Sequence, residues 1–142
     1  MFVKEIIILS ELGIPLFYYN FNKRSNDQVS FLLEACYFDQ FYKFSRNGFK
    51  DNLVCLELSK SRIYFYSHPD SKIYLILRVK NKIKRERKFR NILKKVSLKI
   101  LNDFSNNFKN CLKDFDGDIS RFKCFSYHLE NLVSKWKYLK KD

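Results

Sequence analysis

Few residues of this chain have the types and spacing that could support chemistry. Cys124 and His128 are four positions apart, so on a helix they would share a face, as a thiolate–imidazole pair requires. Such a pair also needs a third group to orient the imidazole and a pocket for the substrate, and the sequence indicates neither. We therefore predict that the protein is not an enzyme.

Metal and phosphate sites are supported no better. The remaining cysteines and His68 do not provide zinc ligands at matched spacing. The segment Asp116-Gly117-Asp118 resembles the start of a calcium loop but lacks the later glutamate, so a turn between helices explains it better. The chain has three glycines and no Walker-type or dinucleotide-binding pattern. We expect no cofactor and no metal, and look for the function on surfaces.

The composition favours a folded protein that lies outside the membrane. Hydrophobic residues make up 46% of the 142 positions and aromatic residues 18%, which is not typical of a disordered chain. No apolar run approaches the roughly 18–20 residues of a membrane span. The N-terminal run contains Lys4 and Glu5 and has no small-residue cleavage site, so we expect no signal peptide.

The four cysteines have no CxxC spacing. We interpret them as free, mostly buried thiols in a reducing compartment. They are Cys36, Cys55, Cys111 and Cys124. We therefore expect a cytoplasmic protein, with peripheral contact to a membrane surface as an option.

The period of the hydrophobic pattern changes along the chain and predicts its elements. Runs of apolar and β-branched residues indicate five strands, at 3–9, 16–21, 52–58, 62–67 and 73–79. Gly13 and Pro15 break the first two runs, as in an antiparallel hairpin. Turn residues at 60–61 and 68–71 make the other three runs a meander.

Three- and four-residue steps indicate the helices. Ser25 and Gln28 have capping-box spacing and begin a helix that runs to about Arg46, before the stop at Asn47-Gly48. A second helical pattern runs from about residue 84 through 108, and a last one from 122 through 136. The predicted order is β-β-α-β-β-β-α-α.

Several segments in this order resemble the longin domain, a profilin-like sandwich. Residues 5–16, EIIILSELGIPL, resemble the first hairpin of that family, and SRIYFY at 61–66 followed by IYLIL at 73–77 looks like its central strand pair. A further set is similar to the segment that joins the last two helices of the family: Phe104, Phe108, Cys111, Phe115 and Phe122. The resemblance extends to about residue 136. The related roadblock fold begins with a helix and is a weaker match.

The longin family includes trafficking adaptor small chains and the N-terminal domain of the signal recognition particle receptor alpha subunit. The resemblance implies an α/β (α+β) three-layer sandwich, in which a five-stranded antiparallel sheet has one helix on one face and two on the other. It also implies a single non-catalytic domain over residues 1–142. Such a domain binds a small GTPase or a partner longin or roadblock subunit, in a homo- or heterodimer, within a membrane-trafficking-like adaptor or GTPase-regulating assembly.

The first predicted helix has more apolar residues than one core requires. Residues 31, 35, 38 and 42 would suffice to pack on a sheet, and a second stripe lies largely outside that face. This stripe either packs under the loop after Arg46 or against Trp136, or it binds a partner, because surplus exposed apolar area tends to mark an interface. The longin resemblance places partner binding on the first helix and the third strand. The predicted partner-binding residues are Leu33, Tyr37, Phe41, Phe44 and Val54.

Positive charge is concentrated between residues 80 and 99, where Glu86 is the one acidic residue, in a chain of net charge +13. This run is either a solvated face or a surface for anionic lipid, an acidic protein or nucleic acid. Nucleic acid is disfavoured because most of the charge is lysine and no groove-reading module is present. The alternative function is thus a basic module that docks on an anionic membrane or on nucleic acid. Its predicted residues are Lys84, Arg85, Arg87, Lys88, Arg90, Lys94 and Lys95.

Overall fold

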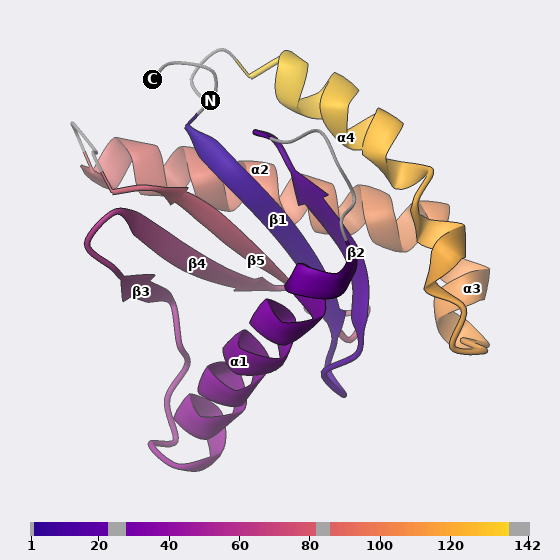
Figure 1. Ribbon diagram of the computed structural model, residues 1–142, viewed down its shortest axis with the longest axis horizontal. Coiled ribbons are helices and arrows are strands. Elements are labelled where there is room, and N and C mark those ends of the chain that lie inside the picture. Colours follow the sequence, from indigo (N-terminus) through magenta and orange to yellow (C-terminus); the bar gives the residue numbers. More distant parts are fainter. Residues whose placement is uncertain (1, 23–27, 82–85, 137–142) are drawn as a thin grey trace.

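The computed structural model describes residues 2–22, 28–81 and 86–136 (Figure 1). Its strands are β1 (Val3–Ser10), β2 (Pro15–Asn20), β3 (Cys55–Glu57), β4 (Ser61–Ser67) and β5 (Ile73–Lys80). Its helices are α1 (Gln28–Asn47), α2 (Glu86–Asn107), α3 (Lys109–Lys113), the 3-10 helix η1 (Ile119–Phe122) and α4 (Phe125–Ser134). In the part of the chain so described, no helix is both long enough and apolar enough to pass through a membrane.

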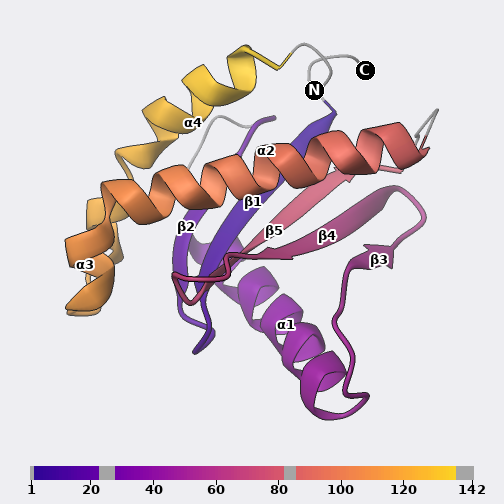
Figure 2. The same ribbon diagram turned by 180° about the vertical axis from the view of Figure 1, so that it is seen from behind.

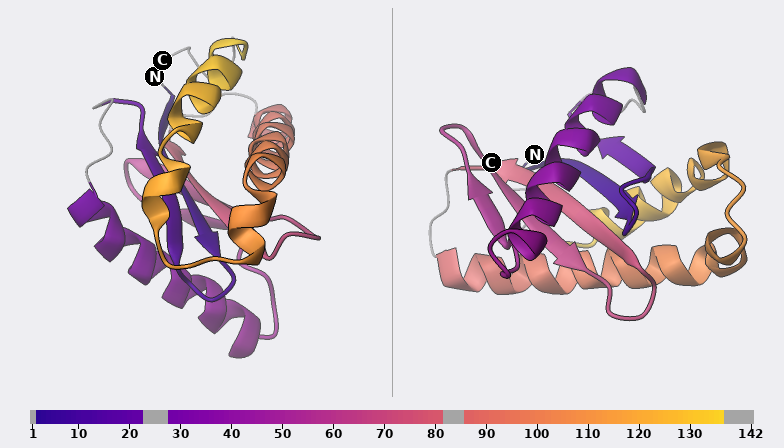
Figure 3. Two further views of the ribbon diagram at one scale, coloured as in Figure 1. Left: turned by 90° about the vertical axis from the view of Figure 1, so that its right-hand side faces the viewer. Right: turned by 90° about the horizontal axis from the view of Figure 1, so that it is seen from below.

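The elements form three layers. The strands make one antiparallel sheet in the order β2-β1-β5-β4-β3. Helix α1 lies on one face, and α2 and α4 lie on the other, as the view from behind and the edge-on view show (Figures 2 and 3). The predicted fold class is confirmed, including one helix on one face and two on the other.

Local turns form the predicted strand pairs. Gly13 has a φ of +84°, and the Ser10 amide donates to the Ile14 carbonyl at 2.9 Å, which closes the β1–β2 hairpin. The β3-β4-β5 meander is also present. The central pairing of β1 with β5 joins the two units, and it places Ile7 opposite Ile76.

Two hydrophobic cores fill the spaces on either side of the sheet. The α2–α4 core is centred on Phe104, whose ring lies between 4.9 and 6.1 Å from four other phenylalanine rings, those of Phe17, Phe108, Phe122 and Phe125. The core under α1 is smaller and contains the helix residues Phe31, Ala35 and Tyr42. Tyr42 stacks on Tyr74 of β5, with ring centroids 4.4 Å apart. These are the side chains that the helical period assigned to the sheet-facing side.

The third strand is shorter than the sequence pattern indicated, because residues 52–54 belong to the loop that connects α1 to β3. The prediction placed a strand at 52–58, whereas β3 contains three residues. The Asp51 amide donates to the Ser45 carbonyl at 3.1 Å, and the Asp51 side chain accepts from the Asn52 amide at 2.8 Å. The backbone at Asp51 and Asn52 is therefore held near the end of α1, and contact with β4 begins at Val54, whose carbonyl accepts the Phe65 amide at 3.0 Å.

The last helix also starts later than predicted. The Asp118 carboxylate accepts the Ser120 amide at 3.0 Å and begins the 3-10 turn η1, so Phe122 lies on η1 and α4 begins at Phe125. The predicted cap at Ser25 and the start of the second helix at residue 84 lie outside the described residues.

The cysteine prediction was half wrong. All four thiols are free, but Cys36 and Cys124 are exposed, and Cys55 and Cys111 are partly exposed. Cys36 follows the buried Ala35 and so turns away from the sheet. Cys124 is the N-cap residue of α4.

Candidate functional site

Helix α1 has an apolar face on the side turned away from the sheet. Burial of Phe31, Ala35 and Tyr42 on the inner side places residues two positions later, such as Leu33 and Phe44, on the outer side. Four large side chains there are more than half exposed: Leu33 (66%), Tyr37 (67%), Phe41 (51%) and Phe44 (60%). We call these four residues, together with Phe49, the α1 apolar face.

Phe49 extends this face beyond the end of the helix. Its ring contacts that of Phe44 edge-on, with centroids 5.0 Å apart, and it is 71% exposed. Sequence reasoning missed Phe49, because Asn47-Gly48 was interpreted only as a helix stop. The two alternatives that would have buried the stripe are wrong: the loop after Arg46 leaves Phe44 exposed, and Trp136 packs against the α2–α4 core.

The α1 apolar face leads along the chain to an edge of the sheet. Val54 is 58% exposed and directly precedes β3. In the sheet that the structure describes, β3 has β4 on one side and no strand on the other. An edge strand offers unpaired backbone groups to another chain. The residues predicted to bind a partner thus all lie at the surface, on α1 and beside β3.

The exposure of this face is energetically unfavourable for an isolated molecule. Full burial of a large apolar side chain contributes about 1.5–3 kcal/mol. Covering the exposed part of these five side chains would therefore contribute on the order of 1 kcal/mol for each side chain. Contiguous apolar surface of this kind marks interaction sites in soluble proteins.

The structure places the predicted basic residues on α2 in different settings. Arg87, Lys88, Lys94 and Lys95 are exposed. Arg90 is exposed as well, but its guanidinium pairs with Glu86 at 2.9 Å and lies 6.0 Å from the centre of the Tyr64 ring. Lys84 and Arg85 lie outside the described residues.

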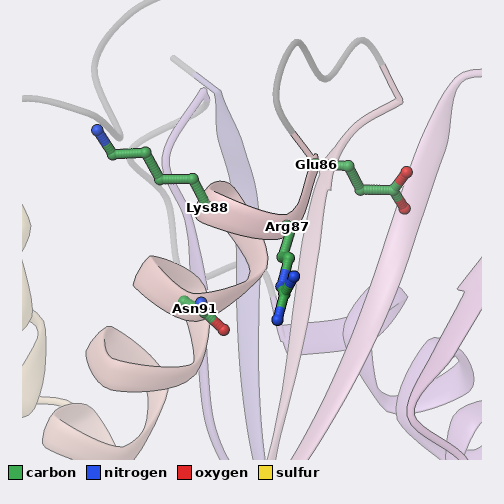
Figure 4. Close-up of a pocket in the computed structure, with 4 residues that line it drawn as sticks. All are labelled: Glu86, Arg87, Lys88 and Asn91. Atoms are coloured by element: carbon green, nitrogen blue, oxygen red, sulfur yellow. The ribbon is translucent and has the colours of Figure 1, made fainter.

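An open depression is present where α2 begins, and Figure 4 shows the side chains that line it. They are Glu86, Arg87, Lys88 and Asn91. Lys88 and Glu86 extend from the helix in opposite directions (Figure 4). The depression belongs to the basic surface, and it brings no nucleophile and base together.

The Cys124–His128 pair is not formed. His128 Nε2 lies 2.9 Å from Asp103 on α2, and the Cys124 thiol donates to the Arg121 carbonyl at 3.5 Å. Asp103 also pairs with Lys99 at 2.9 Å. Burial opposes ionisation of Asp103, but Lys99 and His128 outweigh it and lower the pKa of the carboxyl. This cluster fastens α4 to α2.

The segment at 116–118 is a turn between helices, as predicted. Gly117 has a φ of +91°, and the Asp116 carboxylate accepts from Arg121 at 2.9 Å. Among the residues that the structure describes, no three His, Cys, Asp or Glu side chains are grouped so that they could hold a metal ion.

Two polar clusters on the α1 side of the sheet are satisfied internally. Asp39 of α1 accepts the Tyr74 hydroxyl at 2.5 Å and pairs with Lys43 at 2.8 Å. Burial raises the pKa of Tyr74, and the neighbouring Asp39 raises it further. In the second cluster, the nearly buried Glu5 pairs with Arg78 at 3.0 Å. Both clusters hold elements together, because their polar atoms are used within the fold.

The second cluster predicts a decline in stability at alkaline pH. Tyr18 donates to Glu5 at 3.1 Å, and burial, with the charge of Glu5, raises the pKa of Tyr18 from 10.0 to about 12. A raised folded-state pKa contributes stability below pH 10 that is lost as the pH rises toward 12. We expect the free energy of unfolding to fall over this window and to fall less steeply in Tyr18→Phe. Urea titrations at several pH values test this, and equal slopes for the two proteins would contradict it.

Comparison with solved structures supports the fold. A Roadblock/LC7 domain from Streptomyces avermitilis is similar, with a TM-score of 0.52 and 14% sequence identity, over 73% of this chain and 86% of that one. No family model matches the sequence, and no curated protein matches it. The likeness shows a longin-like, profilin-type fold that a roadblock domain shares, although the sequence pattern ranked that type second. Membership of the longin family itself stays a prediction.

Proposed function

We propose that residues 1–142 form one non-catalytic interaction domain whose α1 apolar face packs against a second domain of the same fold class. In the simplest case the partner is a second copy of this chain. The observation that carries the proposal is the row of Leu33, Tyr37, Phe41 and Phe44, each more than half exposed on the outer side of α1. The longin resemblance supports it, because that resemblance implies partner longin or roadblock subunits.

The distribution of charge favours the α1 side for self-association. Two chains of net charge +13 repel one another over most of their surfaces. The α1 apolar face contains no ionisable residue other than Tyr37. Of the charged residues near it, Asp39 and Lys43 neutralise each other, and the exposed cations Arg46 and Lys50 lie toward its C-terminal end. Contact through α1 keeps the basic α2 helices on the far sides of the pair (Figure 3). A twofold axis through one self-complementary patch is the commonest arrangement for such a dimer.

A small GTPase is the other partner class that the longin resemblance implies. It would compete for the same face, as the first helix and third strand receive partners in that family. In that case the protein would act as a subunit of a trafficking-like adaptor or a GTPase-regulating assembly. The two occupants differ in a measurable way, since one gives a defined dimer of the chain alone and the other gives nucleotide-dependent binding.

The decisive variant removes apolar area from the centre of the face. We expect the purified chain to have twice its monomer mass, and Tyr37→Ser/Phe41→Ser to weaken dimerisation by about 100-fold or more, because central aromatic residues dominate interfaces. Sedimentation equilibrium over a range of concentrations measures this. The control is Tyr127→Ser, which removes a ring that is more exposed still (76%) from α4 on the other side of the sheet. Circular dichroism checks that each variant is folded.

The outcomes separate the two occupants. A chain that is monomeric at every concentration would overturn the homodimer. Capture of a GTP-analogue-loaded small GTPase by the wild type, but not by Tyr37→Ser/Phe41→Ser, would then assign the face to the GTPase. A dimer that Tyr37→Ser/Phe41→Ser leaves intact would show that the contact lies elsewhere.

A further inference from the structure

The outer side of α2 carries two rows of cations in its N-terminal half. Arg87 and Lys94 are seven residues apart, as are Lys88 and Lys95, so each pair lies on one side of the helix about 10.5 Å apart. All four side chains are exposed. We call these four residues the α2 basic face. It lies across the sheet from the α1 apolar face (Figures 2 and 3).

Much of this charge is not neutralised within the fold. Glu86, the acidic residue in the first turn of α2, pairs with Arg62 at 2.7 Å and with Arg90 at 2.9 Å. Within the ranges that the structure describes, no ion pair connects Arg87, Lys94 or Lys95 to a carboxylate. Other cations of the molecule do have partners, for example Lys99 with Asp103.

The position of the cations along the helix is unfavourable for α2 itself. The N-terminus of a helix has partial positive charge, so lysine and arginine stabilise a helix at its C-terminus and oppose it at the start. Arg87 and Lys88 occupy the first turn, and the last turn contains no basic residue. A general lysine bias would not concentrate charge at the disfavoured end. A local violation of helix preferences of this kind is typical of a functional surface.

The chemistry of the α2 basic face fits a lipid surface better than a macromolecular partner. Protein interfaces depend on aromatic or apolar anchors at their centre, and no large hydrophobic side chain of α2 is among the exposed ones. Binding of single-stranded nucleic acid uses aromatic stacking platforms, which this face also lacks. A bilayer rich in anionic headgroups requires only cations near its plane.

We propose that the α2 basic face docks the protein on an anionic membrane surface, with the start of α2 toward the headgroups. The open depression at the start of α2 is lined by Arg87, Lys88 and Asn91 and also by Glu86, whose carboxylate pairs with Arg62 and Arg90. A headgroup phosphate there would meet the amide and cationic donors of the first three side chains. Because α1 lies on the opposite side of the sheet, a partner on the α1 apolar face does not block this contact (Figure 3). The proposal does not depend on the function proposed above, and either can fail alone.

The test compares two variants that lose the same charge, one from the α2 basic face and the other from α3. Lys94→Ser/Lys95→Ser removes half of the α2 basic face. Lys109→Ser/Lys113→Ser removes two exposed lysines of α3, which follows the C-terminal end of α2. Each cation near an anionic surface contributes about fivefold to partitioning, so the first variant should bind about 25-fold more weakly. The second should bind within about twofold of the wild type.

Binding is measured by co-sedimentation of the full chain with phosphatidylcholine vesicles, with and without about one third phosphatidylserine. We expect binding only with phosphatidylserine, and its loss as salt is raised from about 0.1 to about 0.5 M. No binding at low salt, or equal losses in both variants, would overturn the proposal. Tighter binding to a single-stranded RNA than to vesicles at equal salt would overturn it in favour of nucleic acid.

Discussion

Replacing Phe104 by alanine is expected to lower the free energy of unfolding by about 4 kcal/mol. Phe104 is fully buried on α2, and its ring contacts Phe17 of β2 as well as Phe122 and Phe125 from the C-terminal segment. Deleting the ring leaves a cavity that three separate elements border, so none of them can move in to fill it alone. A loss of this size is a large fraction of the roughly 5–15 kcal/mol that stabilises a typical domain.

Urea denaturation measures this effect, and two controls define it. Phe104→Leu keeps much of the volume and should lose less than half as much, while Tyr127→Ala on the exposed side of α4 should change stability by less than about 0.5 kcal/mol. All variants are compared in the Tyr37→Ser/Phe41→Ser background, so that association does not add to stability. A loss below about 1 kcal/mol for Phe104→Ala would mean that the α2–α4 core is not packed around this ring.

The sequence was sufficient for elements whose pattern is local. The period of α1 separated Phe31, Ala35 and Tyr42, which are buried, from Leu33 and Phe44, which are exposed. The turn chemistry at Gly13 specified the hairpin. Each of these inferences depends on neighbours within one turn or one pair of strands, where sequence spacing and spatial arrangement are directly linked.

Contacts between distant segments could not be predicted in this way. Glu5 meets Arg78 across β1 and β5, and His128 meets Asp103 across α4 and α2, although nothing in the residue spacing connects either pair. Only the longin resemblance implied that the hairpin and the meander join in one sheet. A Cys124–His128 pair was set aside from the sequence, but the residue spacing could not identify Asp103 as the partner of His128, because Asp103 lies on another helix.

The two candidate surfaces differ in what the structure adds to them. For the α1 apolar face, it excludes the alternatives that would have buried the stripe, and it adds Phe49. For the basic run, it separates cations that pair with a carboxylate, such as Arg90, from those that pair with none in the described part of the chain, such as Lys94 and Lys95. Because the two surfaces lie on opposite sides of the sheet, the two proposed contacts would not obstruct each other. Salt would also act on them in opposite directions: it screens the charged contact and weakens it, whereas kosmotropic salts strengthen the apolar contact.

The second large effect is expected at the contact between the β1–β2 turn and α1, where Gly13 faces Asp39. A Cβ at Gly13 would lie 2.4 Å from Asp39 Oδ2, and the φ of +84° is unfavourable for alanine. Moving Asp39 aside would disturb the buried hydrogen bond that its Oδ1 accepts from the Tyr74 hydroxyl, as well as its weaker pair with Lys43. We expect Gly13→Ala to lower stability by about 3 kcal/mol, through backbone strain and this clash together.

Asp39→Ala should lower stability by about 2–3 kcal/mol on its own, because it leaves the buried Tyr74 hydroxyl without its acceptor. The loss of the Lys43 pair adds little, since that side chain is 43% exposed.

The two changes should not add. Once the Asp39 carboxylate is gone, an alanine at position 13 meets no obstacle and retains only the backbone strain, so the double variant should be more stable than the sum of the single losses by about 1–2 kcal/mol. Urea denaturation of the four proteins completes the cycle. Losses that add to within about 0.5 kcal/mol would show that the turn yields to the new Cβ, and that the rigidity of this contact does not come from Asp39.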